Sequence, residues 1–509
     1  MPTHSENNKR LAKNTLLLYV RMLFTVGISF YSTRLILANL GVDNYGIYNV
    51  IGGFVSMFYM ITSTMTQAVG RFLTFELGAG DEKKLQQTFS TSINILLLFA
   101  LVVVVLAETV GLWFVNHKLN ISTERMCAAN WIYQFSVMSF IFEMISVPYS
   151  ASVISHEKMG TFAFVTILKV ILTLGIAFLL SVSPIDKLVF YGLLVLFVSI
   201  LVQLMYWIYC KKNFRECRYS FHIDKTIFRN MFGFAGWNFL TTCASMLSSQ
   251  GVSIILNIHF GTVVNAAKGI ASQVNGTVEA FSKNFTTALS PQITKSYAAR
   301  ELEYTKNLVC KGSKFSYLLF FLIALPCILE VDFLLSKWLK EVPPYAGAFV
   351  QLSLLNSLVE VLLNSSEILN RASGKIRNFQ ILVSVTQIFI LLFSYIIIDI
   401  TRNPVWAMAV TNILYIMIFI PRIIINKPFI GITFGYYFRK VLCGIIIMSV
   451  LSVIISLIPI YLLDDGWLRL IMVCVVSTMS IISFSYLFVL TKGEKKVIYN
   501  FIRKNLFNI

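Results

Sequence analysis

Charge is scarce in this sequence. Asp, Glu, Lys and Arg make up only 13% of its 509 residues, whereas 57% are hydrophobic, and the mean hydropathy is +0.75. A soluble chain of this length cannot bury so much apolar surface, so the composition excludes an ordinary soluble protein and indicates a membrane protein. Acidic residues are scarcer than basic ones, 24 against 42, and this excess of positive charge needs an explanation.

The sequence also lacks motifs for metal, redox and nucleotide chemistry. Its five histidines (His4, His117, His156, His222 and His259) show no H-E-x-x-H spacing, and its eight cysteines form no C-x-x-C pair. The segment GAGDEKK at 78–84 has no preceding strand and no G-K-[ST] ending, so it is not a phosphate-binding loop and ATP is not expected to act directly. We therefore predict no enzymatic activity, no metal site and no cofactor.

Long apolar runs separated by short charged segments fill the chain. A helix needs about 20 mostly apolar residues to cross the roughly 30 Å hydrocarbon core. About fourteen such runs are present, so we predict an all-α polytopic membrane protein with about fourteen transmembrane helices. The predicted spans are 14–38, 46–68, 89–110, 127–150, 162–182, 187–210, 230–257, 262–290, 308–330, 346–369, 378–398, 404–421, 436–461 and 467–490.

The basic residues predict how these helices are oriented, because Lys and Arg collect in cytoplasmic loops. With the N-terminus inside, about 30 of the 42 basic residues fall in cytoplasmic segments and only about seven in outside loops. An even number of helices puts the C-terminal tail inside too, where Lys492, Lys495, Lys496, Arg503 and Lys504 fit the rule. Orientation thus explains the positive charge, and nucleic acid is not an expected partner.

The first helix is expected to be an uncleaved signal anchor, since no cleavage-site pattern precedes it.

Five basic residues fall inside predicted helices: Arg21, Arg34, Lys169, Lys268 and Lys283. An ionisable side chain at membrane depth costs about 2.5–3.5 kcal/mol on insertion scales and usually faces a bundle interior or a wet cavity. The first three lie near helix ends, where snorkelling to the headgroups is an alternative explanation. Lys283 and its neighbour Glu279 are harder to explain in that way.

A polar stripe follows one face of the 262–290 helix. Its two ammonium groups and one carboxylate favour a water-filled path, although Glu279 and Lys283, spaced i to i+4, can also neutralise each other and leave Lys268 without a partner. Similar stripes on 230–257 and 346–369 can equally be helix packing surfaces. At about 100° per residue, the stripes comprise Lys268, Ser272, Asn275, Glu279, Ser282, Lys283 and Thr286; Asn238, Thr242, Ser245 and Ser249; and Ser353, Asn356, Glu360, Asn364 and Glu367.

The two halves of the chain resemble each other. A displacement of 220 residues brings LGVDNYG onto FGTVVNA, so that Gly41 meets Gly261. A displacement of 217 residues brings Glu143 onto Glu360, and Phe162 onto Phe379. Helix lengths and charged loops recur in the same order.

Such a repeat of six helices keeps both halves in one orientation, with a substrate path between two parallel bundles. It leads us to predict a six-helix lobe at 1–210, a basic cytoplasmic linker at 211–229, a second six-helix lobe at 230–425, and an extra helix pair with a basic cytoplasmic tail at 426–509.

Three segments carry a resemblance to a known family: RLILANLGVDNYGIYNVIGGF, GRFLTFELGAGDEKKLQQTFSTS and ASGKIRNFQIL. They resemble the polysaccharide transporter branch of the multidrug/oligosaccharidyl-lipid/polysaccharide (MOP) exporter superfamily, the bacterial O-antigen and capsule repeat-unit flippases. The resemblance covers residues about 10–425. It implies two MATE-like lobes, and a central cationic cavity lined by the 14–38, 46–68, 230–257 and 262–290 helices.

The resemblance also implies a function. By alternating access, the protein would move undecaprenyl-diphosphate-linked oligosaccharide from the cytoplasmic to the periplasmic leaflet of the bacterial inner membrane, coupled to H⁺ or Na⁺. A polysaccharide polymerase and a chain-length regulator are the partner proteins this role suggests, and we expect a monomer with both termini in the cytoplasm.

Roles for individual residues follow from the chemistry of that cargo. A diphosphate is drawn to Lys or Arg in a low-dielectric cavity, so we predict a cationic site of Arg21, Arg34, Lys268 and Lys283. Arg21 and Arg34 lie over 100° apart around one helix, so both face the cavity only if that helix bends, for which Gly27 is the candidate position. Sugar needs hydrogen-bonding groups and flat faces, which Tyr48, Tyr59, Asn238 and Asn275 supply. Glu143, Glu279, Glu360 and Glu367 are either coupling acids or structural acids inside each bundle.

Other functions remain open alternatives. A MATE-type cation-coupled multidrug exporter would share the layout, but cationic drugs favour acidic cavities, and here bases outnumber acids. A lipid II flippase has a chemically similar cargo. A membrane polysaccharide polymerase or ligase would be expected to carry a large outside loop, whereas the longest outside connections, 111–126 and 330–345, have only about 16 residues.

Overall fold

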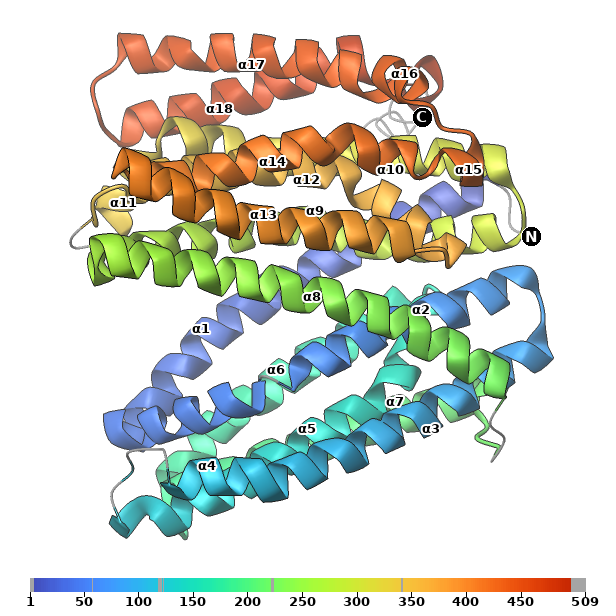
Figure 1. Cartoon of the computed structure of the whole chain (residues 1–509), viewed down its shortest axis with the longest axis vertical. Coiled ribbons are helices and arrows are strands. Elements are labelled where there is room, and N and C mark those ends of the chain that lie inside the picture. The colour runs from blue at the N-terminus through green and yellow to red at the C-terminus, as the bar shows by residue number, and fades with distance from the viewer. Residues whose placement is uncertain are drawn as a thin grey trace, which may run out of the picture. The chain divides into compact units, whose positions relative to one another are not determined.

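The chain folds into helices throughout its described part. The computed structural model describes residues 4–56, 58–117, 121, 123–220, 224–339 and 342–495, and every regular element in these ranges is helical (Figure 1). Lys496, Arg503 and Lys504 of the predicted tail, and His222, lie outside the described residues. The described residues of the predicted spans are almost all helical.

Twelve of the described helical segments are long and apolar enough to cross a membrane. Two predicted spans, 46–68 and 262–290, are not among them. The first is divided between the end of α1 (His4–Ser56) and α2 (Tyr59–Ala79), and the second lies in α9 (Thr262–Ala298), which carries the polar stripe. The protein is therefore a multi-pass membrane protein, but the count of fourteen spans and the division into two six-helix bundles are not confirmed.

The chain divides into two compact units. Unit 1 contains residues 1–242 and 294–300, and unit 2 contains residues 243–293 and 301–509. The helices α8 (Lys225–Phe260) and α9 each contribute residues to both units. The lobe boundaries inferred from the repeat remain a prediction.

Unit 1 is organised around α5. This helix packs against α7, α2 and α1, while α1 also packs along α6. Aromatic side chains fill the interior, where Phe89, Tyr133 and Phe140 are almost completely buried. Besides α1 and α2, the unit contains α3 (Glu82–Leu106), η1 (Ala107–Gly111), α4 (Leu112–His117), η2 (Thr123–Arg125), α5 (Met126–Ser155), α6 (Met159–Leu179), η3 (Leu180–Val182), α7 (Lys187–Asn213), η4 (Arg215–Cys217) and the start of α8.

Unit 2 consists of paired helices, among which α10 packs on α12, α12 on α14, and α13 on α14. The terminal pair, α17 and α18, lies side by side in Figure 1 and packs on α10. Besides parts of α8 and α9, the unit contains α10 (Leu302–Leu329), α11 (Val331–Trp338), α12 (Ala346–Ser373), α13 (Arg377–Thr401), α14 (Val405–Ile424), α15 (Lys427–Ile430), α16 (Phe434–Tyr437), η5 (Phe438–Leu442), α17 (Cys443–Leu462), α18 (Trp467–Phe484) and η6 (Ser485–Val489).

A glycine marks the corresponding break in each half of the sequence. Gly41 interrupts α1 with φ 78° and ψ 166°, and Gly261, its partner in the predicted repeat, separates α8 from α9 with the same φ of 78°. Residues other than glycine rarely adopt this backbone conformation, because their Cβ atom would come too close to the neighbouring backbone. The two glycines aligned by the repeat therefore share a positive φ at the end of the first long helix of each half.

Ion pairs attach the terminal helix pair at two places. Near one end, the carboxylate of Glu330 accepts two hydrogen bonds of 2.8 Å from Arg469 on α18. Near the other, the buried Lys314 of α10 donates to the carbonyl oxygen of Val489 at 3.1 Å and lies 3.8 Å from Glu494. The terminal pair thus belongs to unit 2 and has polar contacts with α10 and with Glu330.

Candidate functional site

A polar cavity of about 290 Å³ lies within unit 1. Residues of five helices line it, and on α1, α5, α6 and α7 the lining residues recur with helical periodicity, so each of these four turns one face toward the cavity. The polar lining consists of Tyr48 from α1, Tyr59 from α2, Ser136, Ser139 and Glu143 from α5, Lys169 and Thr173 from α6, and Tyr191 and Ser199 from α7.

Charges in this cavity are paired. One carboxylate oxygen of Glu143 accepts a hydrogen bond from the Lys169 ammonium group, and the other accepts one from the Tyr59 hydroxyl. Both partners come from different helices than Glu143, which makes the pair a tertiary contact. Lys169, whose alternative explanation was snorkelling, thus contacts Glu143, and the cavity carries no net charge from this pair.

Tyr48, Thr173 and Tyr191 also line a second cavity of about 260 Å³, together with Ser32. The two rings meet edge to face, with centroids 4.8 Å apart and an interplanar angle of 85°. Tyr48 and Tyr59, predicted to contact sugar, therefore line one cavity.

Lys268 of α9 is held by neutral oxygens in unit 2. Its ammonium group donates to the Ser249 carbonyl oxygen at 2.6 Å and to the Ser253 hydroxyl at 2.8 Å, both on α8. Among the described residues no carboxylate lies within ion-pair distance of this group. Its positive charge is therefore solvated by dipoles without being neutralised.

Lys283 differs from Lys268. Its ammonium group lies 3.1 Å from the carboxylate of Glu279, one turn earlier on α9, while its side chain remains 64% exposed. The local pair expected from the i to i+4 spacing is present. Such an exposed pair contributes little to stability and leaves the lysine able to exchange partners.

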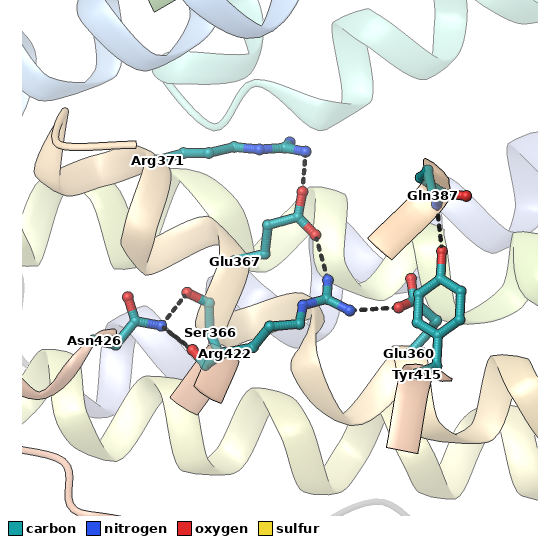
Figure 2. Close-up of polar contacts among 8 residues, drawn as sticks. All are labelled: Glu360, Ser366, Glu367, Arg371, Gln387, Tyr415, Arg422 and Asn426. Carbon is teal, nitrogen blue, oxygen red and sulfur yellow. Dashed lines mark hydrogen bonds and ion pairs between the residues drawn. The ribbon is translucent and has the colours of Figure 1, made fainter. Parts of the chain in front are cut away.

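Glu360 and Glu367 belong to one charged network in unit 2, shown in Figure 2. Arg422 of α14 lies between them, 2.5 Å from Glu360 and 3.6 Å from Glu367, and Arg371 also contacts Glu367. Beside the network, Gln387 donates to the Tyr415 hydroxyl at 2.7 Å, and Asn426 donates to Ser366. Two acids and two arginines balance, so this network is electrically neutral.

The other predicted residues have surroundings of their own within unit 1. Arg21 stacks over the ring of Phe162 at 5.0 Å, whereas Arg34 is exposed and has no ion-pair partner among the described residues. Gly27 keeps helical backbone angles, and the described break in α1 is at Gly41. Asn238 is buried and donates to the Phe234 carbonyl oxygen at 3.1 Å.

Asn275, the fourth predicted sugar contact, lies on α9. Its side-chain carbonyl oxygen is buried and has no hydrogen-bond partner among the described residues.

The fold of this chain was compared with the folds of known proteins. No protein-family model matches the sequence, and no curated protein is significantly similar to it. A MATE transporter solved in the bent conformation superposes with a TM-score of 0.72 at 10% identity, covering 83% of this chain and 96% of its own. An outward-facing multidrug resistance MATE family transporter of the MOP superfamily gives 0.69 at 10% identity, covering 82% and 96%.

The chain has the fold of MATE and MOP superfamily transporters. A MOP superfamily transporter from Pyrococcus furiosus, described as having a binding pocket of reverse polarity, also matches, with a TM-score of 0.68 at 10% identity over 82% of this chain and 96% of its own. At 10% identity these likenesses show the fold alone.

Sequence reasoning missed several residues that complete these sites. Arg422 follows directly after the predicted 404–421 span, where a basic residue is ordinarily assigned to a cytoplasmic loop. It stacks over Phe379 at 5.2 Å, as Arg21 stacks over the repeat-related Phe162. The repeat aligns the two phenylalanines but not the two arginines, so the sequence pointed to the ring positions and not to Arg422. No pattern in the sequence pointed to Ser139 or Tyr191.

Proposed function

We propose that this protein is a flippase for polyprenyl-diphosphate-linked oligosaccharide, undecaprenyl diphosphate being the implied carrier. The observation that carries the proposal is the set of hydrogen-bond partners of Lys268. This lysine lies inside a predicted membrane helix, and the partners of its ammonium group are neutral oxygens. A cation kept at such a place at a free-energy cost suits an anionic cargo, and a diphosphate supplies the missing negative charge.

The partners of the predicted acids support an anionic cargo. Glu143, Glu279, Glu360 and Glu367 each have a cationic partner within their own unit. Neutralised acids offer little attraction to a cationic drug, whereas Lys268 and Arg34 have no carboxylate partner among the described residues. We therefore propose the structural role for Glu143, Glu360 and Glu367, and coupling to H⁺ or Na⁺ has no assigned residue.

The composition of α9 also fits this proposal. It contains the predicted helix 262–290, which the family resemblance assigns to a central cavity, and it is not among the apolar spans of the described residues. A helix that lines a water-filled path needs fewer apolar residues than one surrounded by lipid. In this proposal Lys268, Lys283, Arg21 and Arg34 serve the diphosphate in the inner membrane, and the exported repeat units pass to a polymerase with its chain-length regulator.

Cation-coupled multidrug export is the second candidate, because the solved neighbours are MATE transporters. The two functions predict different phenotypes. Deleting the gene of a flippase traps lipid-linked repeat units on the cytoplasmic leaflet and removes surface polysaccharide. Deleting that of a drug exporter leaves polysaccharide unchanged and lowers resistance to cationic compounds.

The decisive experiment complements the deletion strain with wild type, Lys268→Gln, Lys268→Arg and the double variant Lys268→Ala/Lys283→Ala. A charged hydrogen bond contributes about 1.5–3 kcal/mol, so we expect Lys268→Gln to lower translocation about 10- to 100-fold and Lys268→Arg to retain much of it. Lys211→Gln, in a predicted cytoplasmic segment, is the control. Wild-type translocation by an equally abundant Lys268→Gln protein contradicts this site, and unchanged polysaccharide after deletion contradicts the flippase.

A further inference from the structure

The neutral cavity of unit 1 suggests a ligand of its own. We propose that it binds a neutral sugar ring, as a subsite for one monosaccharide of the oligosaccharide; this rests on the proposed function. The paired Glu143 and Lys169 give the cavity an acceptor and a donor without net charge. A sugar hydroxyl both donates and accepts hydrogen bonds, so the pair can serve neighbouring hydroxyls of one ring.

Ser139 provides independent evidence for a ligand. Its side chain lines the cavity and is only 7% exposed, yet its hydroxyl has no hydrogen-bond partner in the described part of the chain. A buried hydroxyl without a partner costs free energy, so such groups are normally satisfied by protein, water or ligand. Ser139 lies one turn before Glu143 on the same face of α5, within reach of the same ligand.

The walls of the cavity match the two kinds of surface that a sugar presents. Hydroxyl groups of Ser136, Thr173 and Ser199 can meet the polar edge of a ring, and the tyrosines Tyr48 and Tyr191 offer aromatic surface to its C–H face. Volumes of about 290 and 260 Å³ lie near the lower end of ligand pockets, about 300 Å³. Each compartment therefore fits a single ring better than a drug-sized molecule.

Charge excludes the two obvious competitors. An inorganic or drug cation would have to compete with the Lys169 ammonium group, which already occupies one oxygen of Glu143. A uronic acid or phosphate would meet the Glu143 carboxylate beside the lysine. Both would break an existing pair, whereas a neutral ring can bind while the pair stays intact.

The test measures binding of simple glycosides to the full-length protein in nanodiscs by saturation-transfer NMR titration. The probes are the neutral methyl α-glucopyranoside, methyl α-galactopyranoside and methyl α-rhamnopyranoside, with methyl glucuronide, glucosamine and tetraphenylphosphonium as charged comparisons. We expect at least one neutral glycoside to bind more tightly than every charged probe. Ser139→Ala and Thr173→Val should each weaken it about three- to tenfold, which is the loss of one hydrogen bond.

Ser394→Ala is the control, because Ser394 in unit 2 is also buried, its hydroxyl also lacks a partner among the described residues, and it does not line the cavity. It should leave glycoside binding unchanged. Glycoside binding is compared only among variants whose thermal midpoints equal that of wild type. If Ser139→Ala fails to fold, Thr173→Val provides the test. Preferred binding of a charged probe, or neutral binding that neither variant weakens, overturns the sugar site.

Translocation of lipid-linked repeat units by the same proteins separates the two proposals. Translocation together with neutral-glycoside binding supports both. Glycoside binding without translocation keeps the sugar site and rejects the flippase, while translocation without glycoside binding keeps the flippase and rejects the sugar site.

Discussion

Arg422 is the most enclosed charge of the unit 2 network, with a side chain only 3% exposed between Glu360 and Glu367. A buried charge is tolerable only while its partners surround it, because its desolvation must be offset by direct contacts. Glu360 and Glu367 are themselves partly exposed, so the arginine depends on them more than they depend on it. This asymmetry predicts which substitution does most harm.

Removing the arginine should destabilise unit 2. We expect Arg422→Leu to cost about 3 kcal/mol, the lower end of the range for breaking a buried pair, since two carboxylates lose their shared partner. Arg422→Lys keeps the charge but not the planar fork that bridges two acids, and should cost less. Thermal unfolding in detergent measures both, and an unchanged midpoint for Arg422→Leu would show that the network contributes nothing to stability.

Asp186 is a titratable group that lies between two candidate spans. Partial burial acts to raise the pKa of its carboxyl group, but the hydrogen bond from Arg125 at 2.6 Å and those from the backbone N–H groups of Val189 and Leu188 outweigh burial, so the pKa lies below its ordinary value. A lowered pKa in the folded state means that the ionised group stabilises the fold above its unfolded pKa of about 3.9. That stabilisation is lost as pH falls through the folded pKa.

The corresponding test compares wild type with Asp186→Asn across pH. Asparagine can still cap α7, so the variant removes mainly the charge. The difference between the two thermal midpoints should be constant above about pH 5 and shrink below about pH 3.9. A difference that grows on acidification has the wrong sign for this explanation.

At the scale of elements, the breaks at Gly41 and Gly261 decide where the first long helix of each half ends. Neither glycine has an atom within 4 Å of the place where a Cβ would stand, so space does not require glycine there. The requirement comes from the backbone, because both have φ of 78°. Gly41 combines this with ψ of 166°, a region populated almost only by glycine.

Alanine at either break should therefore destabilise the protein by about 1–3 kcal/mol, through backbone strain alone. Gly236→Ala is the matched control: this glycine lies within α8 and also has open space at its Cβ position. There alanine should stabilise the helix by about 0.5–1 kcal/mol. Denaturant or thermal unfolding would reveal the opposite signs, and equal effects at all three positions would contradict the argument from φ.

At the scale of the whole molecule, the terminal pair of helices is attached to unit 2 by charges that have little access to water. Glu330 is completely buried at its contact with Arg469, and Lys314 is buried near Glu494. If the pair is removed, both side chains remain in apolar surroundings without their partners. An appended pair with only apolar contacts would not have this consequence.

Deleting residues 434–509 should thus lower the thermal midpoint of unit 2 strongly. Replacing Glu330 and Lys314 by leucine in the shortened chain should restore part of the loss, because unpaired buried charges then disappear. The same two substitutions in the full chain should destabilise it, since they leave Arg469 and Glu494 without partners. A shortened chain as stable as the full one would show that these contacts are dispensable.

Local patterns in the sequence were sufficient for the features that depend on neighbours along the chain. Apolar runs predicted where the helices lie, the repeat paired Gly41 with Gly261, and i to i+4 spacing predicted the contact of Glu279 with Lys283. Such features depend on hydropathy, on backbone sterics and on reach within one helix, all of which can be read from the residue order. The count of fourteen spans is not confirmed, because the polar α9 is not among the twelve apolar spans of the described residues.

Only the tertiary structure decided which charges are neutralised. It gave Glu143 a partner 26 residues away in Lys169 and Glu360 a partner 62 residues away in Arg422, although the repeat had aligned the two acids. It also brought Ser139, Tyr48 and Tyr191 around one cavity and left Lys268 among neutral oxygens. The physical reason is that a side chain's charge and helical face are fixed by its own sequence, whereas its partner is whatever the packing of other helices brings within a few ångströms.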